Sequence, residues 1–232
     1  MWPQTGEGAA MAGRLEQAVR TGSALALTSV ALAISTVAAA AGESTASLGG
    51  SWERGGRPVY LTVGEPTRAP IGWVDFCIEY KAECATRPSE PRDIVLTAKA
   101  WTDMVKVNDW VNESIKPMTD LEHWGVVERW NYPDDGFGDC EDYMLLKRRL
   151  LMQAGWPRAA LLITVVRDRK GDGHAVLTVK TDRGEFILDN QESQVLPWAK
   201  TGYRFVKRQS QSDPNLWVSL GEPVAPATVS SR

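Results

Sequence analysis

The segment from Gly138 to Gly155 constrains the fold most strongly, because both of its ends carry helix boundary signals. It reads GDCEDYMLLKRRLLMQAG, so Asp139 stands in the N-cap position and two acidic residues occupy the first turn, where the helix dipole favours negative charge. Gly155 is the residue type with which helices commonly end. We therefore predict a helix whose first turn carries Cys140.

The residues after this helix predict antiparallel strands. Residues 159–166 are apolar and β-branched, as in a central strand, and residues 174–180 and 185–188 are two strands joined by a short turn. His174 begins the first strand of this hairpin, and Asp189 follows the second. Neighbouring strands lie ~4.8 Å apart, so the two side chains meet if they share a face. A register shift of one residue would separate them.

Cys140, His174 and Asp189 are the residue types that a thiol-based catalytic centre requires, in the order helix, strand, strand. A thiol nucleophile needs a base that takes its proton, and the base needs an acceptor that holds its tautomer. A cysteine at a helix N-terminus has a lowered pKa, and its backbone N–H is free to stabilise an oxyanion. The alternative is a buried cysteine, a strand histidine and a turn aspartate without a common function. The other histidine, His123, lies in a polar stretch without an obvious partner.

The preceding part of the domain is less regular. We predict a strand at 59–63, a loop at 65–71, a strand-like run followed by a polar turn at 73–84, and a helix at 91–109. Ten tryptophans are unusually many for 232 residues, so we expect a core built partly on large rings.

The N-terminal 41 residues have the features of a secretory signal peptide. Arg14 and Arg20 precede an uncharged stretch from Thr21 to Gly42, which ends in four alanines. The alternative is a membrane anchor, since about 20 apolar residues span a bilayer. The stretch is rich in Ala, Ser and Thr, and no basic cluster follows it, so we favour cleavage. We thus predict a signal peptide at 1–41, a flexible lead-in at 42–57, and one domain at 58–232.

Export to an oxidising compartment changes how the three cysteines are interpreted. Cys77 and Cys84 are separated by six residues and are predicted to form a local disulfide. A metal site is the first alternative, but no histidine or further cysteine lies near this pair in the sequence; two reduced, buried thiols are the second. Cys140 is then the unpaired cysteine, and a leftover cysteine in an exported protein is either buried or reactive.

Four motifs together resemble the bacterial transglutaminase-like cysteine proteinases. They are GDCEDY at 138–143, LLKRRLLMQAG after it, GHAVLTV at 173–179 and ILDN at 187–190. The resemblance covers residues 58–210, and the leading APIGWVDFCIEYKAEC resembles an α-proteobacterial branch of the family. It implies an α+β fold of the transglutaminase-like or papain-like kind, in which the catalytic helix packs on an antiparallel sheet. It also implies that Cys140 is the nucleophile, His174 the general base and acid, and Asp189 the group that orients His174.

The resemblance further implies calcium as a cofactor, because acids that flank the catalytic cysteine bind it in periplasmic members of the family that clip adhesins. Asp139 and Glu141 match these acids, and Asp142 is an additional candidate. A hard cation would offset the effect of neighbouring carboxylates, which raise the pKa of a thiol. The alternative is that Asp139 only caps the helix and Glu141 only complements its dipole. No organic cofactor is expected.

The resulting hypothesis is a periplasmic cysteine peptidase that cleaves a protein of the cell envelope through a thioester intermediate. A regulatory inner-membrane protein is a further partner consistent with the resemblance, whereas a net charge of −3 leaves no basic surface field for nucleic acid. The same chemistry serves a transglutaminase or an amidase acting on envelope proteins or cell-wall peptides, and the residues do not decide between water and an amine as acceptor. A non-catalytic periplasmic binding module is the third alternative, which the complete Cys–His–Asp set disfavours.

Overall fold

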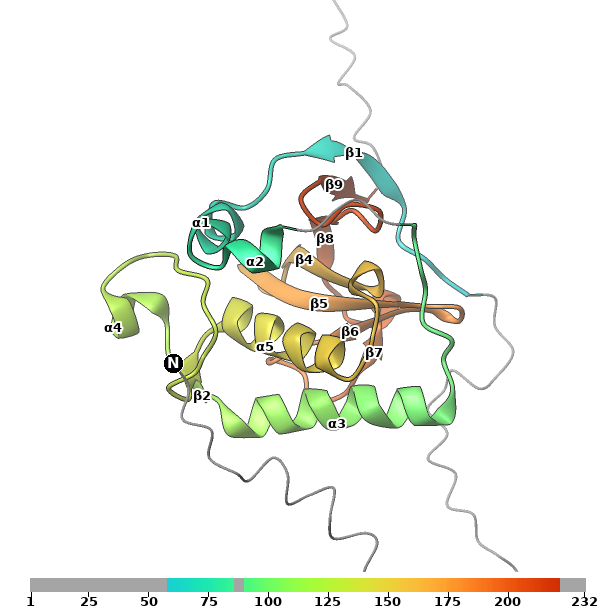
Figure 1. Ribbon diagram of the computed structural model, residues 1–232, viewed down its shortest axis with the longest axis horizontal. Coiled ribbons are helices and arrows are strands. Elements are labelled where there is room, and N and C mark those ends of the chain that lie inside the picture. The colour runs from blue at the N-terminus through green and yellow to red at the C-terminus, as the bar shows by residue number, and fades with distance from the viewer. Residues whose placement is uncertain (1–57, 86–89, 222–232) are drawn as a thin grey trace, which may run out of the picture. The chain divides into compact units, whose positions relative to one another are not determined.

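The computed structural model describes residues 58–85 and 90–221 of the chain (Figure 1). The predicted signal peptide and lead-in, residues 1–57, lie outside the described residues. Among the helices that are described, none combines the length and the hydropathy needed to cross a bilayer.

The core of the domain is a seven-stranded antiparallel sheet. With the two strands of a smaller ribbon, the described strands in chain order are β1 (Val63–Thr67), β2 (Lys116–Pro117), β3 (Phe137–Gly138), β4 (Leu161–Arg167), β5 (Gly173–Thr181), β6 (Gly184–Leu188), β7 (Leu196–Pro197), β8 (Arg204–Gln209) and β9 (Trp217–Leu220). In space the large sheet follows the order β1-β9-β8-β4-β5-β6-β7, and β2 pairs with β3 in a separate parallel ribbon. Strands β4 and β5, whose residues are almost all buried, therefore lie at the centre, as their continuous apolar runs predict.

Helices cover one face of this sheet. They are α1 (Ile71–Glu79), α2 (Lys81–Cys84), α3 (Ala98–Ser114), α4 (Asp120–Trp124) and α5 (Cys140–Gln153), with 3₁₀ turns η2 (Arg158–Ala160) and η3 (Trp198–Lys200). Helix α5 packs against β5 and β4, and α3 runs alongside α5, with its Trp101 against Phe186 of β6 (Figure 1). Helix α5 is thus covered by the sheet on one side and by α3 on another, which explains why nine of its residues are buried.

The helix predicted after Gly138 and the strands that follow it are confirmed. Helix α5 begins at Cys140, and Gly155, with a φ of 90°, follows its C-cap Ala154. Asp139 occupies the N-cap position, but its side chain makes no capping hydrogen bond. Its Oδ2 instead accepts the backbone N–H of Asp120 at 3.3 Å, so this carboxylate serves a tertiary contact.

The predictions for residues 59–84 are wrong in their boundaries and in one element type. The first strand lies at Val63–Thr67, where the chain pairs with β9 as an exposed edge, and not at 59–63. The run 73–84 is helical and not a strand, because Trp73 and Phe76, three residues apart, are the pair that enters the core.

The helix predicted at 91–109 begins only at Ala98 and continues to Ser114. The residues before it are extended, since Ile94 forms a bridge with Thr181 at the end of β5. Thr97 then caps the helix, and its side chain accepts the backbone N–H of Ala100 at 3.0 Å. A tertiary contact with the sheet therefore displaces the start of this helix.

A disulfide joins Cys77 of α1 to Cys84 of α2, with a Cα–Cα distance of 5.6 Å. The ring-rich core is present beside it: Trp73 contacts Phe76, Trp130 and Trp217, at centroid distances of 5.4 to 6.4 Å. The disulfide thus joins α1 to α2, and the ring cluster holds α1 against the rest of the domain.

Candidate functional site

The candidate site surrounds a cavity of about 360 Å³ at the N-terminal end of α5. Cys140 and His174 both line it, from α5 and from the start of β5. Pro70 and Ile71, where α1 begins, form part of its wall. The structure therefore brings two of the three predicted catalytic residues, 34 positions apart in the sequence, to one cavity.

His174 and Asp189 form a buried pair. Strands β5 and β6 pair with Leu177 opposite Leu188, which places the start of one strand beside the end of the other. The His174 Nε2 atom lies 2.8 Å from Asp189 Oδ1, and the two residues are 4% and 3% exposed. The register is therefore the one in which both side chains share a face.

Asp189 is an acceptor held in place from several sides. Its Oδ1 also accepts the backbone N–H of Gln191 at 2.9 Å, and its Oδ2 accepts the hydroxyl of Tyr203 at 2.6 Å. Burial by itself would raise the pKa of Asp189. The hydrogen bond and charge of His174, with the Tyr203 and Gln191 bonds, outweigh burial and hold the pKa below its ordinary value.

The second ring nitrogen of His174 is available to the cavity. Because Nε2 faces Asp189, Nδ1 is the atom left for a proton transfer, and its neighbour is the side-chain Nε2 of Gln191 at 3.4 Å. The ring of Tyr203 meets the imidazole edge-on at a centroid distance of 5.8 Å. These contacts fix both the tautomer and the orientation of the imidazole.

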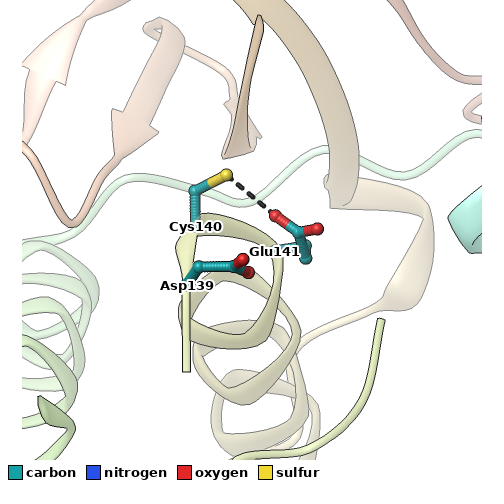
Figure 2. Close-up of side chains that lie close together, drawn as sticks. All are labelled: Asp139, Cys140 and Glu141. Atoms are coloured by element: carbon teal, nitrogen blue, oxygen red, sulfur yellow. Dashed lines mark hydrogen bonds between the residues drawn. The ribbon is translucent and has the colours of Figure 1, made fainter. Parts of the chain in front are cut away.

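The pKa of the Cys140 thiol is raised, contrary to the low pKa expected at a helix N-terminus. Figure 2 shows the Sγ atom directed at Glu141, whose Oε2 accepts a hydrogen bond at 2.8 Å. Burial, followed by the charge of Glu141, raises the pKa of Cys140 well above its ordinary value. A backbone hydrogen bond from Ala175 acts in the opposite direction and is too weak to compensate. Desolvation and an adjacent carboxylate therefore outweigh the helix dipole here.

Three carboxylates converge behind Cys140. Oxygens of Asp120, Asp139 and Asp142 lie within 4.8 Å of one another. Burial, partly opposed by hydrogen bonds, raises the pKa of all three, that of Asp142 to about 8. Repulsion between carboxylates adds to this effect for Asp139 and Asp142, whereas the charges of His123 and Arg129 oppose it for Asp120. Asp139 Oδ1 and Asp142 Oδ2 are buried without a hydrogen-bond partner among the described residues.

This cluster fits a hard cation such as calcium. Calcium prefers oxygen ligands, and the three aspartates offer only oxygen. A second group of close atoms, from Asp139, Cys140 and Glu141, includes sulfur, which calcium does not favour. The structure thus joins Asp139 and Asp142 of the predicted ligands to Asp120, whereas Glu141 contacts the thiol (Figure 2).

Several residues of the site are not apparent from the sequence. Asp120 lies 19 positions before Asp139, at the start of α4, where it looks like an ordinary first-turn acid. Tyr203 and Lys207 come from the loop before β8 and from β8 itself, which pairs with β4. No local motif marks these positions, because only the strand order brings Tyr203 to Asp189 and Lys207 to the cavity. Gln191 is the exception, since it directly follows the LDN motif.

Comparison with known proteins gives one family and one set of similar structures. The profile of the family described as bacterial transglutaminase-like cysteine proteinases matches residues 63–224. No curated protein sequence matches the chain. Calcium-bound LapG of Legionella pneumophila is 27% identical, over 53% of this chain and 72% of LapG, with a TM-score of 0.44. EGTA-treated LapG of the same organism is 27% identical, over 52% and 70%, with a TM-score of 0.43.

Proposed function

Since the chain belongs to the bacterial transglutaminase-like cysteine proteinase family and is a cysteine peptidase, we propose that it cleaves a protein of the cell envelope with Cys140, His174 and Asp189 as its triad. The observation that carries this proposal is the 2.8 Å contact between His174 and Asp189, beside the cavity that Cys140 lines. The family supplies the reaction class, and this contact supports the assignment of the residues.

In the proposed reaction His174 Nδ1 takes the proton from Cys140, and Sγ attacks the carbonyl carbon of the scissile peptide bond. The protonated His174 donates this proton to the leaving amine, and a thioester between Cys140 and the acyl part of the substrate results. A water molecule, deprotonated by His174, then hydrolyses the thioester. The backbone N–H of Cys140, at the first position of α5, is a donor that the helix itself cannot pair, and we assign it to the developing oxyanion.

Asp189 keeps His174 in the tautomer that this sequence of steps requires. A proton on Nε2 is shared with Asp189, so Nδ1 is unprotonated and able to accept. Burial and the charge of Glu141 raise the pKa of the Cys140 thiol, so the proposed reaction needs His174 to take the thiol proton.

Calcium is proposed as the cofactor of the aspartate cluster. Asp120, Asp139 and Asp142 would hold the ion, and their partnerless oxygens support this assignment. Once bound, calcium would neutralise carboxylate charge next to the thiol, which otherwise disfavours thiolate formation. The solved LapG structures include a calcium-bound form.

The periplasmic location is also part of the proposal. It rests on the sequence of residues 1–41 and is consistent with the Cys77–Cys84 disulfide, since disulfides persist in oxidising compartments. A regulatory inner-membrane protein would act on the peptidase there.

One experiment tests the proposed activity. The purified protein is incubated with bacterial envelope extracts, with and without calcium, and fragments are identified by mass spectrometry against a Cys140→Ala control. We expect fragments that end in a free carboxylate and appear only with the wild-type protein. Adducts between glutamine side chains and amines would instead indicate a transglutaminase. If no product depends on Cys140, the protein would be a binding module.

A further inference from the structure

One wall of the cavity is a row of three residues on adjacent strands. Ala175 of β5 is opposite Val165 of β4, and Val165 is opposite Lys207 of β8. All three line the cavity, so their side chains share one face of the sheet. Strands are ~4.8 Å apart, so the backbone of Lys207 lies about 10 Å from that of Ala175, the residue next to His174.

The ammonium group of Lys207 is only partly satisfied within the protein. Its Nζ donates one hydrogen bond, to the backbone carbonyl of Arg68 at 2.9 Å. An ammonium has three donors, so two are left. No carboxylate of the described residues lies within 4.0 Å of this atom. Burial lowers the pKa of Lys207, which shows that the surrounding protein solvates this charge poorly.

The acidic residues of the cavity lie on other elements. Glu128, which also lines the cavity, lies beside Gly72, where a Cβ atom would come within 2.9 Å of its Oε1. Glu141, the second acid of the lining, contacts the Cys140 thiol. Lys207 is therefore the one cationic residue of the described lining besides the imidazole of His174.

We propose that Lys207 is a specificity-determining residue, which selects substrates carrying Asp or Glu two or three residues from the cleaved bond. This inference rests on the proposed peptidase function. An extended substrate rises ~3.3 Å per residue, so about 10 Å from Ala175, the residue next to His174, corresponds to two or three residues. An acidic side chain there would take the free donors of Lys207, while an acidic side chain next to Glu128 or Glu141 would be repelled. Lysine and arginine at the same substrate position would be disfavoured.

The test is a peptide library with every residue type at each of three positions on both sides of the cleaved bond. Cleavage is measured for the wild-type protein, with Cys140→Ala as the blank. We expect enrichment of Asp and Glu at one position, and a kcat/KM about tenfold higher for a Glu peptide than for its Gln counterpart. Lys207→Met should reduce this ratio to about one with little change for the Gln peptide, and Lys207→Glu should favour Lys at that position.

Lys170→Met is the matched control. It removes the same charge from the exposed turn between β4 and β5, outside the cavity, and should leave the Glu-to-Gln ratio unchanged. An equal loss on all peptides, or an unchanged ratio in Lys207→Met, would overturn the inference while leaving the peptidase intact.

A binding measurement separates this failure from that of the proposed function. Calorimetric titration of Cys140→Ala protein with the Glu and Gln peptides reports recognition without turnover. Preferential binding of the Glu peptide that Lys207→Met removes would support the inference even if no peptide is cleaved. Without cleavage and without such a preference, both the function and the inference are wrong.

Discussion

Helix α5 buries charges of opposite sign in two adjacent regions, and the two regions solve the problem differently. Its first turn carries Glu141 and Asp142 next to Asp139, and burial raises the pKa of these acids. Its second turn carries Lys147 and Arg148, both about 99% to 100% buried, and burial lowers their pKa. In both regions burial disfavours the charged form of the side chains, so it raises the pKa of the acids and lowers the pKa of the bases.

The two bases point to separate partners. Arg148 lies 3.7 Å from the carboxylate of Glu83, and its Nε donates to the backbone carbonyl of Leu161 at 3.2 Å. The charges of Asp189 and Asp109 act on Lys147 and partly oppose the lowering of its pKa by burial. Among the aspartates behind Cys140, Asp120 accepts a backbone donor, and the charges of His123 and Arg129 only partly offset its burial. Packing thus explains Arg148, which ties the disulfide-linked α2 to α5, whereas Asp139 and Asp142 each keep a buried oxygen without a hydrogen-bond partner among the described residues.

The largest expected effect is a loss of catalysis at the first turn of α5 that leaves the stability of the fold almost unchanged. Cys140→Ala should lower kcat/KM about 10⁴-fold or more, because the nucleophile is lost, while the free energy of unfolding changes by less than about 1 kcal/mol. Peptide cleavage and urea unfolding measure the two quantities on the same preparation. If the variant were strongly destabilised, the first turn would contribute to the fold in the way that the second turn does.

The second prediction concerns the partner of Arg148. Glu83→Gln should lower the free energy of unfolding by about 3 kcal/mol, because it leaves a buried guanidinium without its counter-ion. Urea unfolding at neutral pH measures the change. Glu79→Gln is the control: the same substitution removes the 3.6 Å pair with Arg129, in which both side chains are roughly half-exposed, and should cost less than about 0.5 kcal/mol. Equal effects would show that burial of Arg148 does not matter.

Calcium should act on the first turn alone. At 100 times its dissociation constant, calcium should stabilise the folded protein by about 2.7 kcal/mol, since only the folded state assembles the aspartate cluster. The melting temperature in calcium and in EGTA reports this difference. Asp142→Asn and Asp120→Asn should each reduce it strongly, whereas Glu141→Gln should reduce it less, because Glu141 contacts the thiol. A melting temperature that calcium leaves unchanged at millimolar concentration would contradict the assignment.

The parts of this molecule that the sequence predicts are those in which neighbouring residues determine the structure. Helix α5, the hairpin of β5 and β6, and the pairing of His174 with Asp189 follow from boundary residues and alternation within about fifty positions. Helix α1 was not predictable in this way. Its outer face carries Ile71, Val74 and Ile78, which are exposed, so the polar side that marks an amphipathic helix is missing.

The electrostatics of the site also exceed what the sequence determines. The pKa of Cys140 depends on its burial beneath the sheet and on which way Glu141 turns, and neither is encoded by local spacing. Asp120 and Lys207 reach the site only through tertiary packing. A motif identifies the reacting atoms, but the surrounding chain sets their charge state.

The last expected effect is a difference in pH dependence between the two regions. Asp142 has a folded pKa raised to about 8, so its folded state binds a proton that the unfolded state releases, and stability should fall as the pH rises from about 4 to 8. Lys147 has a folded pKa lowered to about 7, so the unfolded state binds the extra proton, and stability should rise from about pH 7 to 10.5. Each slope is at most about 1.4 kcal/mol per pH unit. Urea unfolding in EGTA across this range should show Asp142→Asn reducing the fall, to which Asp139 and Glu141 also contribute, and Lys147→Met reducing the rise. If one variant removed both slopes, the two regions would titrate as a single coupled group.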